Sequence, residues 1–269
     1  MLYKYEMHVH DSLCSRCGHN PPEVIAKVYY DRGYAGMCFT NHFLQGSTAI
    51  DKTLPWEDKV RAYWNAYLRV KDWAKDKDFD ILFGLEHHYG SGKEMLTYGI
   101  DLDFLLAHPN IDVAPIKDYC DAVHEAGGFV SQAHPFRRAP YIDPNVLPQP
   151  ELLDAAEIYN AGSSDEDNSR GYDFAKENHL YGTSGGDTHE QHEPNIGKAG
   201  MAFPYRIKTE KELANATAAA SSTVSFSPRK IFDPISERKT HGITQGTLPH
   251  RHRSLQLPHH GAGARRAPL

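Results

Sequence analysis

Short apolar runs alternate along the chain with amphipathic segments. Runs with the length and composition of buried strands occur at residues 35–40, 81–85, 129–133, 155–159 and 180–184. We interpret residues 2–10 and 104–107 as two further strands. From Trp56 to Lys75, apolar residues recur at spacings of three and four, which predicts an amphipathic helix. Strands that alternate with helices indicate βαβ units, so we expect one α/β domain over residues 1–215 with a mostly parallel sheet or barrel.

Metal-binding residues follow most of the predicted strands. Alternate side chains of an extended strand project to the same face, so His8 and His10 would point to one place. The predicted strand ends carry His8, His10, His42, Glu86, His108, His134, Asp187 and His189. In barrels of this kind the chemistry lies at the carboxyl ends of the strands, so we expect these side chains to form one site. A single His-x-His pair also occurs without a metal, and the prediction therefore depends on the whole set.

The number of these residues predicts more than one metal ion. Imidazole and carboxylate groups bind zinc, manganese and iron, and one tetrahedral ion cannot use all the ligands present. Two ions about 3.5–4 Å apart, bridged by a carboxylate, suit the hydrolysis of phosphate esters because they activate a water and stabilise both reacting oxygens. We therefore expect two or three Zn, Mn or Fe ions as cofactors and a small phosphorylated substrate.

Composition narrows the possible functions. The chain has 269 residues, 17 histidines and a formal net charge of −6, which argues against extended nucleic-acid binding. No apolar run approaches the ~18 residues of a membrane helix and no signal peptide is recognisable, so we expect a cytoplasmic protein without membrane contact. The four cysteines do not suggest a disulfide framework. Cys14 and Cys17 could be half of a zinc site or a redox pair, although we favour a partly exposed loop.

The C-terminal segment has a different composition. No acidic residue occurs from Arg238 to Leu269, and Pro, Gly, Arg and His are frequent there without clear periodicity. Such a composition buries too little apolar surface to offset the entropy of ordering, so we predict a disordered tail over residues 216–269. A metal-binding histidine tract or a nucleic-acid-binding tail is the functional alternative.

Six short segments together resemble a known family. They are His8-Val9-His10, Thr40-Asn41-His42, Glu86, Ala133-His134-Pro135, Glu157-Ile158-Tyr159-Asn160 and Ser184-Gly185-Gly186-Asp187-Thr188-His189. Their order along residues 1–213 resembles the PHP family, which is named for polymerase and histidinol phosphatase. The resemblance implies a distorted, TIM-like (β/α)7 barrel with a site for up to three metal ions at the carboxyl ends of its strands.

The resemblance also implies roles for individual residues. The implied ligands are His8, His10, His42, Glu86, His134, Asp187 and His189, and the implied catalytic residues are Glu86, Asp187 and His189. Glu86 would be the bridging carboxylate. His19 and His108 are candidates for two further ligands, and His87 is a rival of His108. Arg137 could bind the substrate phosphate through its guanidinium, or it could form a surface salt bridge.

The activity implied is hydrolysis of phosphoesters. A small-molecule phosphomonoesterase of the histidinol-phosphatase type, using a metal-bridging hydroxide, is our first hypothesis. A 3′–5′ exonuclease or nucleotide phosphodiesterase is the alternative, but it would need a basic track that the acidic balance does not indicate. A catalytically inactive, metal-stabilised binding module is the alternative from another class, and such a module would be expected to lose ligands.

Overall fold

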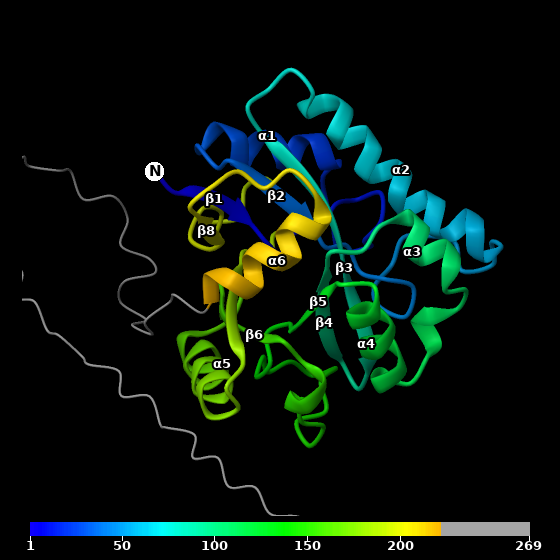
Figure 1. The fold of residues 1–269 in the computed structure, drawn as a ribbon, viewed down its shortest axis with the longest axis vertical. Helices are drawn as coiled ribbons and strands as arrows, with labels where there is room; N and C mark the ends of the chain where they lie inside the picture. The colour runs from blue at the N-terminus through cyan, green and yellow to red at the C-terminus, as the bar shows by residue number, and fades with distance from the viewer. Residues whose placement is uncertain (222–269) are drawn as a thin grey trace, which may run out of the picture. The chain divides into compact units, whose positions relative to one another are not determined.

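The fold is built on one curved sheet of eight strands, in the order β7-β6-β5-β4-β3-β2-β1-β8 (Figure 1). The structure is a computed structural model and describes residues 1–221. The strands are β1 (Tyr3–Glu6), β2 (Gly36–Phe39), β3 (Asp80–Gly90), β4 (Lys93–Tyr98), β5 (Phe129–Gln132), β6 (Ala155–Asn160), β7 (Tyr181–Gly185) and β8 (Met201–Phe203). The segments after β1 and β7 meet where Val9 pairs with Thr188, so the sheet is nearly closed into a barrel.

Most neighbouring strands are parallel, and two strands run against the rest. β1, β2 and β3 pair in parallel, as do β5, β6 and β7. β4 is antiparallel to both β3 and β5, and β8 is antiparallel to β1. The predicted α/β barrel is therefore confirmed, with two antiparallel strands that the sequence pattern did not indicate.

Helices pack around the sheet (Figure 1). They are α1 (Pro22–Asp31), α2 (Trp56–Ala74), α3 (Leu102–Ala107), α4 (Ile116–Glu125), α5 (Asp165–Glu177) and α6 (Glu210–Ser221), with short 3-10 turns at Ile111–Val113 and Pro150–Leu152. The apolar stripe of α2 is buried as its spacing predicts, with Val60, Tyr63, Tyr67 and Val70 turned inward. None of the helices in residues 1–221 is long and apolar enough to cross a membrane.

Alternation along the strands divides the buried apolar side chains into two clusters. Met37 and Val130 belong to a cluster shared with α1, α2 and α4. Their neighbours Cys38 and Phe129 belong to a second cluster that also includes Leu213 of α6. Successive strand residues face opposite sides, so one cluster fills the space between sheet and helices and the other fills the barrel interior.

Three expectations from the sequence need correction or restriction. The strand expected at 104–107 is wrong: these residues lie in α3, because the side chain of Asp101 accepts a hydrogen bond from the backbone N–H of Phe104 and caps a helix. The expected domain boundary at residue 215 falls inside α6, so residues 216–221 of the predicted disordered tail are helical instead. Residues 222–269, for which we predict disorder, lie outside the described part of the chain.

Asp80, the first residue of β3, joins β1 to the segment after β8. Its Oδ2 accepts hydrogen bonds from the Tyr5 hydroxyl at 2.5 Å and from Arg206 Nε at 2.7 Å, and its Oδ1 accepts one from Lys208 Nζ at 2.8 Å. Burial would raise the pKa of Asp80, but these three donors outweigh it and lower the pKa below its ordinary value. A lowered pKa in the folded state means that the ionised form stabilises the fold.

We expect Asp80→Asn to lower the free energy of unfolding by about 1–3 kcal/mol at pH 7, because hydrogen bonds to a charged group are lost. The loss should begin to shrink as the pH falls below about 4, the ordinary pKa of the unfolded carboxyl, and should vanish only below the lower pKa of folded Asp80. Urea unfolding at pH 7 and at a pH below about 4 measures this loss of unfolding free energy. Asp78, whose side chain is 90% exposed and pairs with Arg206, is the matched control, and Asp78→Asn should change little. An equal loss from Asp80→Asn at both pH values would contradict the claim that the ionised carboxylate of Asp80 stabilises the fold.

Candidate active site

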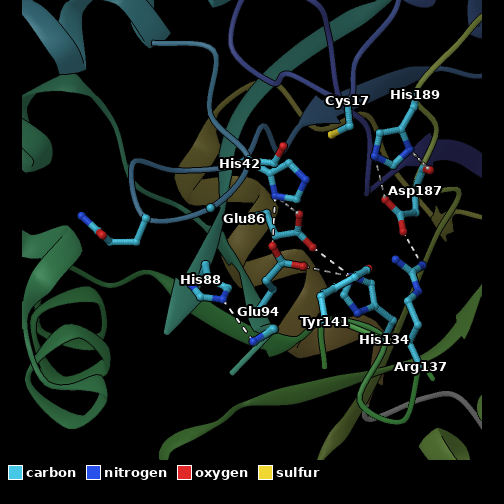
Figure 2. Close-up of a pocket in the computed structure, with 14 residues that line it drawn as sticks. Cys17, His42, Glu86, His88, Glu94, His134, Arg137, Tyr141, Asp187 and His189 are labelled. Carbon is cyan, nitrogen blue, oxygen red and sulfur yellow. Dashed lines mark hydrogen bonds and ion pairs between the residues drawn. The ribbon is translucent and has the colours of Figure 1, made fainter. Parts of the chain in front are cut away.

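The carboxyl ends of the parallel strands surround a cavity of about 440 Å³ (Figure 2). Histidines and carboxylates gather around it from six places: His8 and His10 after β1, His42 after β2, Glu86 in β3, Glu94 in β4, His134 after β5, and Asp187 and His189 after β7. Four overlapping groups of three have ligand atoms within 4.8 Å of one another: His8, Glu86 and His134; His8, His10 and Asp187; His10, His42 and His189; and His42, Glu86 and Glu94. The predicted convergence on one site is observed for seven of the nine candidate ligands.

Glu86 lies at the centre of the cluster. Its Oε1 is 3.2 Å from His8 Nε2 and 3.1 Å from His134 Nε2. Its Oε2 is 3.5 Å from His10 Nε2 and 2.8 Å from His42 Nδ1. Because each oxygen faces a different pair of imidazoles, this side chain can serve two neighbouring ions at once.

Asp187 connects a second part of the cluster to Arg137. Its Oδ1 is 3.4 Å from His8 Nε2 and 3.2 Å from His10 Nε2. Its Oδ2 accepts a short hydrogen bond from Arg137, which also donates to Asn160 Oδ1 at 2.9 Å. The backbone of Asp187 is left-handed, with φ of 54°, a conformation that is uncommon outside glycine and is often found at functional sites.

Burial and neighbouring charges set the protonation of the cluster. Burial opposes a charge on His8, but Asp187 and two further carboxylates outweigh it and raise the pKa of His8 well above its ordinary value. Burial and the imidazole of His42 lower the pKa of His10 to about 3. Although burial opposes ionisation of Glu86, His42 and His8 lower its pKa. Glu86 is therefore ionised and His10 neutral, which are the forms that bind metal cations.

Several buried imidazole nitrogens lack a hydrogen bond, and His8 Nε2 and His10 Nε2 are the two in this cluster whose residues are fully buried. The Nε2 atoms of His8 and His10 are both inaccessible to solvent and make no hydrogen bond among the described residues. Buried polar atoms are nearly always satisfied, and an orphaned pair directed at the same carboxylates needs an explanation. Metal ions would supply it, because imidazole nitrogen and carboxylate oxygen are suitable donors for divalent ions.

Further side chains hold these ligands in place from behind. Glu157 Oε1 lies 3.1 Å from His8 Nδ1, and its Oε2 accepts from the His134 backbone N–H at 2.9 Å. The Ser15 hydroxyl is 3.3 Å from His10 Nδ1 and accepts from the His42 backbone N–H at 3.1 Å. Such contacts fix the tautomer and direction of a metal-binding imidazole.

Glu157→Gln is expected to lower metal affinity by about 10–100-fold, because an amide cannot hold His8 in its ligating tautomer as a carboxylate does. Isothermal titration calorimetry of the metal-free protein measures this change. Glu166→Gln is the matched control, because Glu166 contacts only Arg138 at the surface among the hydrogen bonds and ion pairs of residues 1–221. Equal affinities for wild type and Glu157→Gln would contradict this role.

Three predicted or rival ligands lie outside the cluster. His19 is exposed, and only its backbone reaches the site, where its N–H donates to His189 O at 2.8 Å. His108 follows α3, with Nδ1 2.8 Å from Phe104 O. His87 alternates with Glu86 on β3 and therefore faces the opposite side of the sheet, where it stacks on Tyr119 at 4.0 Å.

One residue of the site, Glu94, was missed from the sequence, and another, Cys17, was considered as a ligand but not favoured. Glu94 is 3.1 Å from His42 Nδ1 and 3.7 Å from His134 Nε2. It reaches the site because β4 is antiparallel, and its pairing with His88 could have been found only by recognising the hairpin. Cys17 lines the cavity, and although burial opposes ionisation, His189 and His42 lower the pKa of its thiol to about 6. Its partner in the Cys-x-x-Cys motif, Cys14, lies in the apolar core instead.

Comparison with known proteins identifies the fold. No protein-family profile matches the chain, and no curated protein is significantly similar. Among solved structures, the chain is similar to a two-domain protein from Bacteroides vulgatus that contains a predicted PHP-like metal-dependent phosphoesterase, with a TM-score of 0.59, 12% identity, and coverage of 82% of this chain and 64% of that one.

Two further structures support the same fold. The lesion-specific endonuclease PfuEndoQ from Pyrococcus furiosus has a TM-score of 0.56 and 13% identity, with coverage of 81% of this chain and 56% of that one. A candidate metal-dependent phosphoesterase from Bifidobacterium adolescentis has a TM-score of 0.50 and 14% identity, with coverage of 79% and 94%. The chain spans less than two thirds of the Bacteroides and Pyrococcus proteins. The resemblance to the PHP family is thus confirmed at the level of the fold.

Proposed function

We propose that the chain is a metal-dependent hydrolase of phosphoesters, and that small phosphomonoesters are its substrates. The observation that carries this proposal is the convergence of buried imidazoles and carboxylates on one cavity, with His8 Nε2 and His10 Nε2 lacking hydrogen bonds. The PHP-like fold agrees with it, although a fold alone does not establish an activity. An inactive binding module would need no such complete set of ligands.

The donors fit two or three divalent ions. We assign them to His8, His10, His42, Glu86, Glu94, His134, Asp187 and His189. This set adds Glu94 to the residues expected from the sequence and omits His19 and His108, which lie elsewhere. Bound divalent ions would supply a water activated near neutral pH and positive charge for the phosphoryl oxygens. Glu86, Asp187 and His189 would contribute to catalysis by holding and orienting these ions.

The cavity suits a small substrate. Its volume of about 440 Å³ lies within the ordinary range of small-molecule sites. Gln45, Ser47, Tyr141 and the cationic Arg137 line it, so it offers hydrogen-bond donors and one fixed positive charge to a phosphoryl group. These features favour a small phosphomonoester over a nucleic-acid chain, which would need an extended basic track.

Hydrolysis of p-nitrophenyl phosphate and of its bis ester, with added Mn²⁺ or Zn²⁺, tests the proposal. We expect wild type to cleave the monoester faster, and Asp187→Ala and His10→Ala to lose activity while remaining folded by circular dichroism. His192→Ala, which changes an exposed histidine near His189, is the matched control and should stay active. Preference for the bis ester would instead favour a phosphodiesterase. Absence of turnover with at most one bound ion would favour a binding module.

Arg137 is proposed to hold a phosphoryl oxygen while its other contacts anchor Asp187. We expect Arg137→Lys to raise KM for p-nitrophenyl phosphate about tenfold or more, because lysine keeps the charge but loses the planar fork. Steady-state kinetics combined with metal analysis measures the effect. An unchanged KM with full metal content would exclude Arg137 from substrate binding.

A further inference from the structure

The loop between β1 and α1 brings one thiol to the edge of the cluster. Cys17 is half-buried and lines the cavity together with His42 and His189. Figure 2 shows its sulfur beside these two imidazoles. A thiol placed among histidines in this way is available as a ligand as well as a hydrogen-bond donor.

Backbone hydrogen bonds fix the loop on both sides of Cys17. The N–H groups of Arg16 and His19 donate to the carbonyl oxygens of Ser47 and His189, both at 2.8 Å. The second bond ties the loop directly to the segment that carries a proposed ligand. The direction of the thiol is therefore set by the fold rather than by a freely moving loop.

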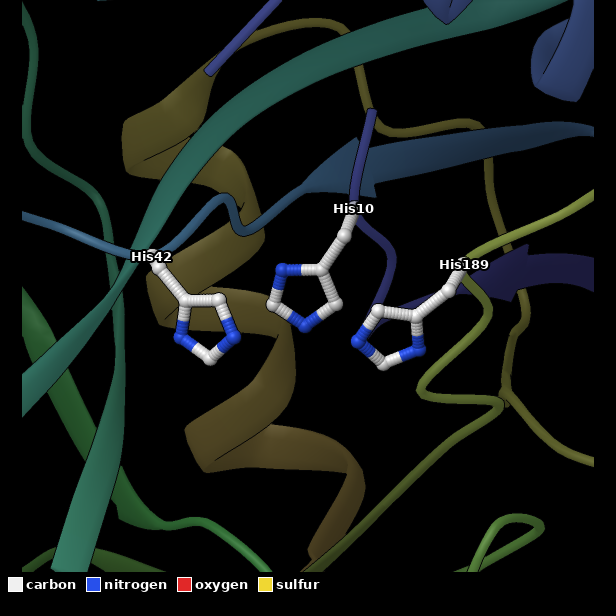
Figure 3. A group of neighbouring side chains, drawn as sticks. All are labelled: His10, His42 and His189. Carbon is white, nitrogen blue, oxygen red and sulfur yellow. The ribbon is translucent and has the colours of Figure 1, made fainter. Parts of the chain in front are cut away.

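His42 and His189, which lie beside the thiol, form a group of three with His10 (Figure 3). Ligand atoms of His10, His42 and His189 lie within 4.8 Å of one another, and His10 is the middle ring. His10 Nδ1 is 3.3 Å from the Ser15 hydroxyl, which donates its own proton to a neighbouring amide oxygen. Nδ1 of His10 must therefore carry a proton, and the lone pair lies on Nε2, which is buried without a hydrogen bond.

The other two rings, those of His189 and His42, also leave Nε2 available for a ligand. His189 Nδ1 is 2.8 Å from the carbonyl oxygen of Asp187, so this nitrogen is the donor and Nε2 keeps the lone pair. His42 directs Nδ1 at the carboxylates of Glu86 and Glu94, which leaves its Nε2 on the other side of the ring. Three imidazoles therefore face one space, and the Cys17 thiol lies beside two of them, His42 and His189.

We propose that Cys17 is a metal ligand whose thiolate completes a Cys/His₃ set with His10, His42 and His189, and that it makes this position selective for zinc over manganese. Four such donors match the tetrahedral preference of Zn²⁺, and thiolate favours zinc, whereas manganese prefers oxygen ligands. The remaining part of the cluster, around Glu86 and Asp187, is richer in carboxylate. The inference rests on the proposed function in so far as it assumes bound divalent ions, and it deepens that function by naming the metal of one position.

Cobalt substitution tests the proposal directly. Full-length protein is stripped with a chelator and loaded with Co²⁺, and we expect a thiolate-to-cobalt charge-transfer band in the near ultraviolet that Cys17→Ser abolishes. Cys17→His should also lack the band while it retains the bound ion. Zn²⁺ affinity of Cys17→Ser should fall at least about 100-fold, since even the loss of an outer partner of a ligand costs 10–100-fold, while Mn²⁺ affinity is retained.

His19→Ala is the matched control, because His19 is the other candidate ligand in the same loop. It should keep both the band and the Zn²⁺ affinity. Absence of the band in loaded wild type, or its persistence in Cys17→Ser, would overturn the assignment. The cobalt spectrum and the metal affinities do not depend on turnover. A protein that shows a Cys17-dependent band but no phosphoesterase activity would support the thiolate ligand. It would overturn only the proposed function.

Discussion

Glu86→Gln is expected to lower kcat/KM for a phosphomonoester by about 1,000-fold, which corresponds to ~4 kcal/mol of transition-state stabilisation. The change is nearly isosteric, but it replaces a buried negative charge whose two oxygens each face two imidazoles. An amide offers one oxygen and cannot serve two neighbouring ions. We therefore also expect fewer ions per chain, which mass spectrometry of the purified protein measures together with the kinetics.

Glu94→Gln is the matched comparison for Glu86→Gln. Glu94 approaches only His42 and His134 among the ion pairs of the described residues, and its side chain is 10% exposed, whereas that of Glu86 is fully buried. Its replacement should reduce activity less and should remove at most one ion. If Glu86→Gln and Glu94→Gln lower kcat/KM and metal content equally, Glu86 does not bridge two ions.

Gly185→Ala is expected to have the second largest effect. A Cβ at Gly185 would lie 2.3 Å from His8 Cβ and 2.9 Å from Glu157 Oε1, so β7 and the end of β1 could not keep their present spacing. Overpacking of this kind costs about 1–3 kcal/mol of stability. The displacement also moves His8, and a shift of about 1 Å in an active site can lower the rate 100-fold.

Thermal unfolding of Gly185→Ala measures the loss of stability, and its kinetics measure the effect of moving His8. Gly33→Ala is the control: Gly33 has φ of 75°, and an added Cβ there would meet no atom within 4 Å. It should lose about 1 kcal/mol from backbone strain and keep full activity. If Gly185→Ala lost stability but kept its metal affinity, the contact with His8 would be structural alone.

The sequence predicts the site better than it predicts the sheet. Apolar runs followed by His, Glu or Asp locate seven of the proposed ligands, because parallel strands of a barrel end at one face. The antiparallel β4 was missed, since Lys93 and Glu94 interrupt its apolar pattern and a tight turn separates it from β3. Its glutamate was missed for the same reason. Local sequence pattern cannot show which direction a strand runs.

Residues on loops were the hardest to place. His19 was a candidate for a further ligand, yet its ring is exposed and Cys17, two residues earlier, lines the cavity. Spacing from His10 carries no periodicity in a loop, so only the backbone contacts of Arg16 and His19 decide which side chain faces inward. His108 was misplaced because the apolar run before it suits either a strand or a buried helix.

The contact between β1 and the segment after β7 has a consequence for how the chain is made. Glu6, in β1, accepts a hydrogen bond from the backbone N–H of Gly186, 180 residues later. Contacts between residues so far apart in sequence form slowly, because a long loop must close before they yield any stabilisation. On the ribosome, His8 and His10 therefore emerge long before Asp187 and His189, and the proposed metals can be held in full only after synthesis has passed β7. Metal retention should consequently distinguish completed chains from fragments that stop short of that strand.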